Sequence, residues 1–372
     1  MRIKRILQNL LLLFVSLMFT IALIEAGVRL AKTELHPPKL FISQTEGVPY
    51  KLRANFHGHT TTGIPLDINS LGVRDNEYQL QPPPNTFRIV VLGDSVTMGQ
   101  AVRQEDSYPK QLEALFAAEK EKGLRNTTVE VINAGVSGYG THEEMLFLKE
   151  TAIMYSPDMI IVGFALNDIG SVPLVLRGKD IKSQAFFKVK EFVKYNLWSY
   201  SYMLRTIGSF KYNIAHIGSR RSESITANAI NEEDYTPKSA AWNTTYEAVK
   251  ELKATADANN ARLVIAILPE LRFFNNTAPQ AYKYAGLQKS ISGQFKQIGE
   301  ESRTSGTSGT ESRENWAGIE IVDLLSALSS YARQEITVSE TDAHPNKKGN
   351  ELAAKAIKEF LDQKDLIRPG PS

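Results

Sequence analysis

Five short runs of mostly apolar, often β-branched residues recur along the chain, and longer segments separate them. Runs that are apolar almost without alternation are typical of strands buried on both faces of a parallel sheet. Between them, residues 106–121 and 142–155 place apolar side chains at helical spacing. This alternation predicts a three-layer α/β/α fold with a five-stranded parallel sheet in the strand order 2-1-3-4-5. The predicted strands lie within residues 88–92, 129–133, 159–168, 262–269 and 319–324.

Polar residues or glycines directly follow three of the predicted strands. The first run stops at Gly93-Asp94-Ser95, the second breaks into a loop that contains Gly138, and the third ends at Asn167. A serine between a strand and a helix lies near backbone N–H groups that can stabilise an oxyanion. The usual nucleophile elbow needs glycine two residues after the serine, and Thr97 stands there. A fourth polar segment, Asp342-Ala343-His344-Pro345-Asn346, precedes a helical segment near the C-terminus.

Each of these residues also has an ordinary structural interpretation. Ser95 and Asp342 are both suited to capping a helix N-terminus. His344 fits a surface turn, Gly138 fits any loop, and Asn167 fits a turn that closes a strand. The catalytic interpretation needs the residues together, because a serine hydroxyl becomes a good nucleophile only when a base takes its proton. Histidine is the usual base.

Taken in order, the four segments resemble the motifs of the SGNH hydrolase superfamily, the GDSL esterases and lipases. The resemblance spans roughly residues 86–362. It implies the SGNH hydrolase fold, which is flavodoxin-like. It also implies that Ser95 is the nucleophile and that His344 is the base. Asp342 would then orient the imidazole of His344 and stabilise its charged form.

The same resemblance implies an oxyanion hole. Its donors would be the backbone N–H groups of Ser95 and Gly138 and the side-chain amide of Asn167. Two positions depart from the family pattern. The family often has its aspartate three residues before the histidine, where Thr341 stands here, so the role of Asp342 is less secure. Ala165 takes the place of the glycine that commonly precedes the asparagine motif.

The composition is that of an ordinary folded protein, with 42% hydrophobic and 23% charged residues. A formal net charge of +2 does not suggest a nucleic-acid binder. The chain has no cysteine, which excludes disulfides, thiol catalysis, cysteine-based metal sites and a lipoprotein anchor. His57-Gly58-His59 has the spacing of a metal pair but no clustered third ligand. We therefore expect no metal and no cofactor.

The N-terminus predicts a membrane segment. Residues 6–24 form an apolar run of 19 residues, and Arg2, Lys4 and Arg5 precede it. That length suits a spanning helix, and residues 24–28 contain no Ala-x-Ala cleavage signal. We interpret the run as a single transmembrane anchor in the plasma membrane. A cleaved signal peptide and a buried core helix are the alternatives.

The basic flank predicts that residues 1–5 are a cytoplasmic tail and that the remainder is extracytoplasmic. Residues 35–86 are expected to form an irregular extension that ends in a proline-rich linker. Residues 87–365 would be the hydrolase domain, with a helical insertion at about 171–245. Residues 302–315 are predicted to be a flexible loop.

The first part of that insertion is basic and aromatic. Residues 171–221 contain ten Lys or Arg against Asp180 and Glu191. Three interpretations remain: a lid over the substrate cleft, a surface for anionic lipid or polysaccharide, or an ordinary helical insertion with solvated lysines.

These features favour a membrane-anchored serine esterase that acts through an acyl-enzyme. Water or an acceptor hydroxyl could release the acyl group, so O-acyl transfer remains an alternative to hydrolysis. Location and family resemblance suggest O-acetyl groups on envelope or extracellular polysaccharide as the substrate class. A non-catalytic glycan-binding protein is a further alternative. A Rossmann-type nucleotide binder fits poorly, because the first strand leads to Gly-Asp-Ser and not to Gly-x-Gly-x-x-Gly. The acyl chain and the oligomeric state stay open.

Overall fold

The computed structural model describes residues 2–30, 40–43, 47–60, 63–169, 230–275, 277, 282–305, 318–340 and 342–367. The chain divides into two units. One comprises residues 1–40 and 178–226, and its described part is the N-terminal helix with Leu40. The other comprises residues 41–177 and 227–372 and contains the sheet. The basic aromatic segment 171–221 lies outside the described residues.

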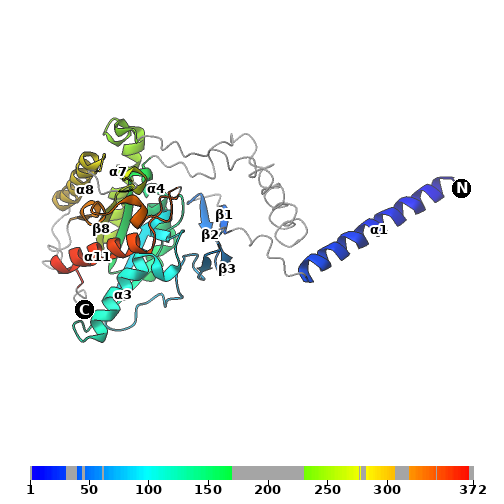
Figure 1. The fold of residues 1–372 in the computed structure, drawn as a ribbon, viewed down its shortest axis with the longest axis horizontal. Helices are drawn as coiled ribbons and strands as arrows, with labels where there is room; N and C mark the ends of the chain where they lie inside the picture. The colour runs from blue at the N-terminus through cyan, green and yellow to red at the C-terminus, as the bar shows by residue number, and fades with distance from the viewer. Residues whose placement is uncertain are drawn as a thin grey trace. The chain divides into compact units, whose positions relative to one another are not determined.

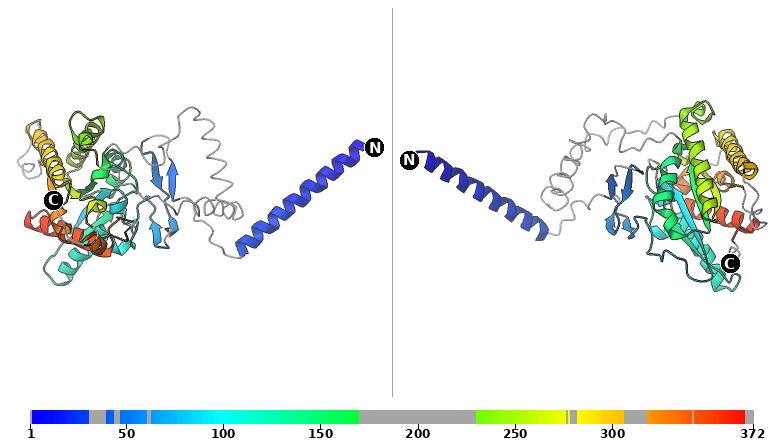
Figure 2. Two further views of the ribbon diagram at one scale, coloured as in Figure 1. Left: turned by 45° about the horizontal axis from the view of Figure 1, so that its top comes forward. Right: turned by 180° about the vertical axis from the view of Figure 1, so that it is seen from behind.

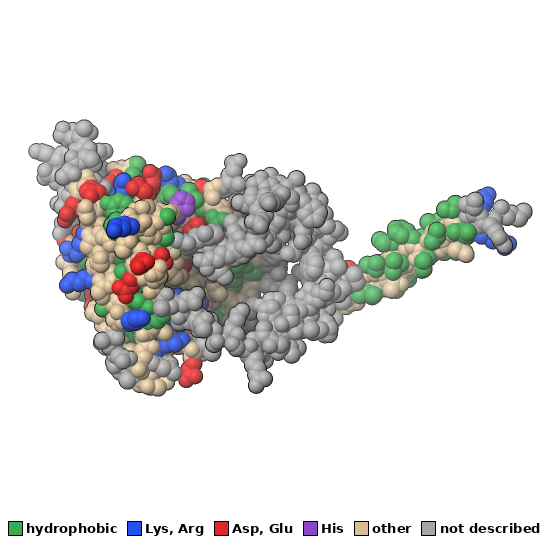
Figure 3. Space-filling view, turned by 90° about the horizontal axis from the view of Figure 1, so that it is seen from above, with side chains coloured by type: hydrophobic (Ala, Val, Ile, Leu, Met, Phe, Trp, Pro, Cys, Tyr) green, Lys and Arg blue, Asp and Glu red, His purple; other side chains and the backbone are tan. Residues whose placement is uncertain are grey.

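Helix α1 (Arg2–Leu30) contains the predicted membrane segment. The stretch Lys4–Gly27 has a mean hydropathy of 2.3, and its side chains are exposed. Figure 3 shows the hydrophobic side chains along the helix. At 1.5 Å per residue, 24 residues extend for about 36 Å, which exceeds the hydrocarbon core of a bilayer. The helix is therefore long and apolar enough to cross a membrane, as a signal sequence can also be.

The second unit is built on a parallel sheet in the order β6-β5-β7-β8-β9 (Figures 1 and 2). In chain order this is 2-1-3-4-5, so the predicted topology is confirmed. Each strand falls on one of the predicted apolar runs, because a strand covered on both faces needs apolar side chains on both. The strands are β5 (Thr86–Gly93), β6 (Thr128–Asn133), β7 (Met159–Ala165), β8 (Arg262–Leu268) and β9 (Glu320–Asp323).

Helices cover both faces of this sheet. On one face, α3 (Tyr108–Glu121) and α11 (Lys347–Gln363) pack against each other and against the apolar core of the sheet. On the other face lie α4 (Thr141–Glu150), α7 (Ala240–Ala258) and α8 (Ala285–Ser305). Aromatic contacts fix this second layer: Phe295 of α8 meets Phe164 of β7 edge-on at 5.1 Å and stacks on Trp242 of α7 at 5.6 Å. The three-layer arrangement is the predicted one.

Both predicted helical segments divide in two. Residues 106–121 contain the end of a short 3-10 helix, η1 (Gln104–Asp106), and then α3. Residues 142–155 contain α4 and η2 (Ala152–Tyr155). The remaining short helices are α2 (Ser95–Met98), η3 (Leu166–Asp168), η4 (Glu232–Tyr235), η5 (Leu271–Phe273), α9 (Leu325–Leu328) and α10 (Arg333–Ile336).

The described part of the N-terminal extension is more regular than we expected. Strands β1 (Phe41–Ser43) and β2 (Tyr50–Leu52) pair antiparallel, as do β3 (Phe56–His59) and β4 (Pro65–Ile68). Strands of three or four residues are too short to show an alternating pattern, which explains why the sequence did not predict them.

Arg74 ties the extension to the end of α2 and to the segment that follows it. Its side chain is fully buried. The guanidinium donates to the backbone carbonyls of Met98 at 3.0 Å and Val102 at 2.8 Å, and also to that of Gly99. A buried cation held by several carbonyl oxygens fixes the loop on which it lies.

The predicted insertion at 171–245 lies mostly outside the described residues. Its last residues, from Ala240, belong to α7 and cover the sheet. Of the predicted loop at 302–315, residues 302–305 are the end of α8, and the others lie outside the described part.

Candidate active site

Ser95 is the first residue of α2, directly after strand β5. The turn between them depends on Gly93, whose φ of +155° is rarely adopted by residues with a side chain. A Cβ there would lie 2.0 Å from Oγ1 of Thr97. Asp94 caps the helix by accepting a hydrogen bond of 2.8 Å from the backbone N–H of Val96. These residues carry Ser95 to the carboxyl end of the first strand of the sheet.

The structure brings Ser95, His344 and Asp342 into one chain of hydrogen bonds. Ser95 Oγ lies 2.8 Å from Nε2 of His344. Nδ1 of the same ring lies 2.6 Å from Oδ1 of Asp342, which also accepts from the backbone N–H of His344 at 3.0 Å. The two-residue spacing therefore lets one carboxylate oxygen contact both the ring and the backbone of the histidine.

The electrostatics of the pair favour the charged form of both groups. The hydrogen bond to Asp342 raises the pKa of His344 above its ordinary value, although burial opposes this. The same bond lowers the pKa of Asp342. Asp342 is thus an ionised acceptor at neutral pH, so the Nδ1 atom of His344 carries the proton and Nε2 accepts from Ser95.

The segment around His344 is held between α10 and α11. The backbone N–H of Val338 donates to the carbonyl of His344 at 3.0 Å. Asn346 caps α11 by accepting from the N–H of Gly349 at 3.0 Å, and its own side-chain amide donates to the carbonyl of Thr337 at 2.9 Å. These contacts fix the backbone on both sides of the histidine, which positions the ring over Ser95.

Gly138 lies in the loop between β6 and α4. The loop packs beside the serine turn, because the N–H of Val136 donates to the carbonyl of Gly93 at 2.9 Å. Gly138 has a φ of +81°, in the left-handed region that glycine adopts without strain. Within the part of the chain that the structure describes, neither the Ser95 N–H nor the Gly138 N–H donates to another protein group. Both are thus available to a ligand.

Asn167 lies in η3, just beyond strand β7. One N–H of its side-chain amide donates to Oδ2 of Asp94 at 3.0 Å. Asp94 is buried, and its burial raises the pKa of the carboxyl above its ordinary value. Two hydrogen bonds, from Asn167 and Val96, satisfy this carboxyl. Through these two bonds Asp94 positions both the N-terminus of α2 and the amide of Asn167. Among the described residues, the second N–H of that amide remains free to donate to a ligand.

Two buried carboxyl groups, those of Asp168 and Glu144, lie near Asn167, and the sequence reasoning noted only Asp168, as part of the turn that closes the strand. Asp168 accepts from the N–H of Ala165 at 2.6 Å, and Glu144 of α4 is almost fully buried. Within the described residues, neither carboxylate oxygen of Glu144 has a hydrogen-bond partner. Burial, with the neighbouring acids, raises the pKa of both groups well above their ordinary values. Both groups therefore hold their proton at pH values where an exposed carboxyl group has lost it.

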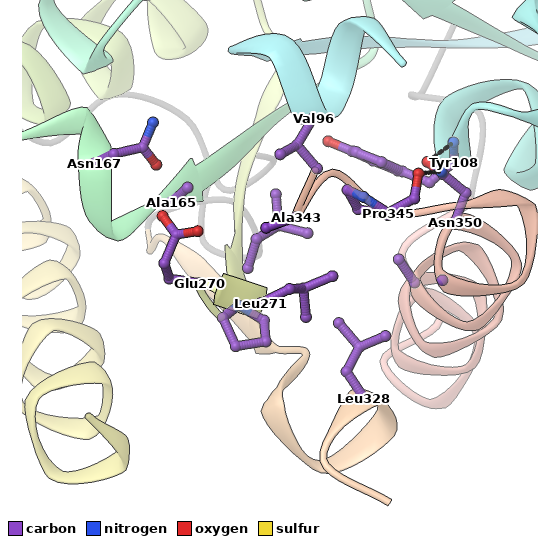
Figure 4. Close-up of a pocket in the computed structure, with 14 residues that line it drawn as sticks. Val96, Tyr108, Ala165, Asn167, Glu270, Leu271, Leu328, Ala343, Pro345 and Asn350 are labelled. Carbon is purple, nitrogen blue, oxygen red and sulfur yellow. Dashed lines mark hydrogen bonds between the residues drawn. The ribbon is translucent and has the colours of Figure 1, made fainter. Parts of the chain in front are cut away.

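A small, mostly apolar pocket lies beside the site (Figure 4). Val96, Leu271 and Leu328 face it, with Asn167 and Glu270 at its border. Glu270 follows strand β8 and pairs with Arg272 at 2.7 Å. The sequence offered one signal for Glu270: an acidic residue at the carboxyl end of a predicted strand. That signal is too common to be useful alone.

His57 and Asp67 form an exposed pair at 2.8 Å on the β3–β4 hairpin. Over the described ranges, no group of three or more His, Cys, Asp or Glu side chains could hold a metal ion.

A known protein family matches the part of the chain that contains most of the sheet. The sequence model of the GDSL-like lipase/acylhydrolase family matches residues 91–304. That range includes Ser95, Gly138 and Asn167, whereas Asp342 and His344 lie beyond it. No curated protein matches the chain.

Several solved structures resemble this one at low sequence identity. The structure titled TesA is 10% identical with a TM-score of 0.40, and the alignment covers 74% of this chain and 99% of that one. The psychrotrophic esterase EstA from Pseudoalteromonas sp. is 15% identical with a TM-score of 0.39, covering 74% and 97%. The acetyl xylan esterase AlAXEase is 12% identical with a TM-score of 0.40, covering 74% and 100%.

Proposed function

The chain belongs to the GDSL-like lipase/acylhydrolase family, and from this premise we propose that it is a serine esterase that works through an acyl-enzyme. One observation carries the proposal: the continuous hydrogen bonds from Ser95 through His344 to Asp342. A serine that only caps a helix has no need of a histidine 2.8 Å from its hydroxyl. The same observation favours catalysis over a non-catalytic glycan-binding role.

In the first step, Nε2 of His344 accepts the proton of the Ser95 hydroxyl as Oγ attacks the ester carbonyl carbon. The ring becomes an imidazolium. Asp342 stabilises it, because its carboxylate is ionised and lies 2.6 Å from Nδ1. The carbonyl oxygen takes up the negative charge of the tetrahedral intermediate.

Three donors would stabilise that oxyanion: the N–H groups of Ser95 and Gly138 and the second amide N–H of Asn167. The first amide N–H of Asn167 is bound to Asp94, so the amide does not have to reorganise when charge develops. The intermediate collapses when the ester C–O bond breaks, and His344 returns its proton to the leaving alcohol. The acyl group is then on Ser95.

Water then completes hydrolysis: Nε2 of His344 accepts a proton from water as the water oxygen attacks the acyl carbon. The bond from that carbon to Oγ of Ser95 breaks, His344 returns the proton to Oγ, and the free acid leaves. An acceptor hydroxyl in place of water would make the protein an O-acyltransferase. That alternative shares the first half-reaction and therefore all of the residues above.

We propose ester-linked acyl groups as the substrate. The small apolar pocket beside Val96 and Asn167 suits a short acyl chain. If α1 anchors the chain through residues 6–24 with the catalytic unit outside the plasma membrane, O-acetyl groups on envelope or extracellular polysaccharide are the substrates within reach.

Intact-mass analysis after addition of an aryl acetate tests the proposal. Full-length protein in detergent should gain one acetyl group, located on Ser95 by peptide mapping. Ser95→Ala should gain none and should lose turnover by several orders of magnitude while keeping its fold. An acceptor sugar that takes the acetyl group in preference to water would favour transfer. Wild-type turnover in Ser95→Ala would overturn the proposal.

A further inference from the structure

Tyr50 of the N-terminal extension reaches the loop that carries Gly138. The residue is 2% exposed, and its hydroxyl donates to the carbonyl oxygen of Ser137 at 2.7 Å. The ring packs against Tyr139 at 5.2 Å and edge-on against Phe41 at 5.3 Å. The hydroxyl of Tyr139 in turn donates to the backbone carbonyl of Tyr50. These contacts fix the ring of Tyr50 from both sides, so its hydroxyl is directed toward the carbonyl of Ser137.

The accepting carbonyl belongs to the peptide unit that joins Ser137 and Gly138. The same unit carries the N–H of Gly138, and in a trans peptide the C=O and N–H point in opposite directions. A bond that holds the carbonyl on one side therefore holds the N–H on the other. Such a restraint matters here because Gly138 has no side chain to limit rotation of this peptide.

We propose that Tyr50 is a positioning residue of the esterase site, whose hydroxyl holds the Ser137–Gly138 peptide with its N–H turned toward the oxyanion. The proposal rests on the proposed function and adds to it a residue from outside the four motifs. The N-terminal extension would then contribute to the geometry of the active site through Tyr50.

Further contacts dock the strand of Tyr50 on α4, the helix that follows the loop. The N–H of Val48 donates to Glu150 at 3.2 Å, and Lys51 forms an ion pair with the same carboxylate at 2.9 Å. Burial also raises the pKa of Tyr50 above its ordinary value, so the hydroxyl stays protonated and remains a donor. Strand, loop and helix thus form one unit around the Ser137–Gly138 peptide.

Tyr50→Phe in the full-length protein tests the proposal, because it removes the hydroxyl and keeps the ring. Tyr155→Phe is the matched control: its hydroxyl is also buried and also bonds the extension, accepting from Asn69 at 2.9 Å. We expect kcat for an aryl acetate to fall about two- to tenfold in Tyr50→Phe, the range for loss of one hydrogen bond. KM and the acidic limb of the pH profile should not move. In Tyr155→Phe, kcat should stay at the wild-type value. Equal kcat in the two variants would overturn the proposal.

A double-mutant cycle with Gly138→Ala provides a second readout. A Cβ at Gly138 would lie 2.7 Å from the hydroxyl oxygen of Tyr50, and the next nearest atom, Cζ, would lie 4.0 Å away. Gly138→Ala should therefore reduce kcat less in the Tyr50→Phe background than in wild type. The strain of a left-handed φ is common to both backgrounds and cancels. Equal reductions would contradict the proposed contact.

Measuring the wild type and Ser95→Ala in parallel separates the two levels of inference. Turnover and acylation that depend on Ser95, with a Tyr50→Phe variant indistinguishable from wild type, would overturn only the role of Tyr50. A wild type that is never acylated would overturn the proposed function and this proposal with it.

Discussion

Removal of the Asp342 carboxylate should reduce activity and shift its pH dependence at once. Asp342 contacts His344 twice through one oxygen, at 2.6 Å to Nδ1 and 3.0 Å to the backbone N–H. A hydrogen bond to a charged group contributes about 1.5–3 kcal/mol. The Asp342 side chain is 39% exposed, so water screens part of its charge and the lower part of that range applies.

In the proposed mechanism the imidazolium of His344 forms in the transition state, so this energy should appear in the rate. At about 1.4 kcal/mol for each factor of ten, the lower part of that range means that Asp342→Ala should lower kcat/KM by roughly ten- to fortyfold. The pH profile should move as well. Asp342 raises the pKa of His344 in the wild type, and with His344 as the proposed base we expect activity to be lost as pH falls through that raised pKa. Without the carboxylate the pKa falls, so the acidic limb should shift to lower pH.

Initial rates on one aryl acetate from pH 5 to pH 9, with folding checked by circular dichroism, measure both effects. Asp342→Asn is the matched control, because its amide oxygen can keep the contact to the His344 backbone while the charge is lost. A near-normal Asp342→Ala enzyme with an unshifted limb would refute the reasoning. Ser95 and His344 would then act as a dyad, and Asp342 would have only a structural role.

Asn167, Glu144 and helix α1 can each be tested directly. Asn167→Ala should lower kcat by about 10²–10³ with little change in KM, because the lost donor acts mainly on the developing oxyanion. Steady-state kinetics measure this, and an unchanged kcat would exclude Asn167 from the oxyanion hole. Glu144→Gln should raise the melting temperature at pH 8 more than at pH 5. Burial raises the folded-state pKa of Glu144, so its contribution to stability is present below its unfolded pKa and is lost as pH rises. Thermal melts at the two pH values check this, and an equal change at both would contradict it. If residues 6–24 anchor the chain with the catalytic unit outside, protease added to intact spheroplasts should degrade that unit. Protection until lysis would reverse the orientation, and a soluble form beginning near residue 27 would identify a cleaved signal.

The sheet and its order could be read from the sequence because their signals are local. A strand buried on both faces needs an unbroken apolar run, so each run predicts one strand at that place in the sequence. The parallel order then follows from the helical segments between the runs. The positions of Ser95, Gly138 and Asn167 follow from the same logic, since each comes just after a strand and the carboxyl ends of the strands share an edge.

Other features depended on the tertiary structure. The hydroxyl of Tyr50 meets the carbonyl of Ser137 across 87 residues of sequence, and no periodicity in either segment signals that contact. Asp94 directly precedes Ser95 in the sequence, but only the fold places the amide of Asn167 against its second carboxyl oxygen.

The sequence by itself determined the strands of the parallel sheet and their order, and it identified the residues that could carry the chemistry, because propensity and burial act within a few neighbouring residues. Only the tertiary structure decided which hydroxyl, amide or carboxylate orients each of them. A hydrogen bond needs its partners within about 3 Å, and that distance is set by how separate elements pack together.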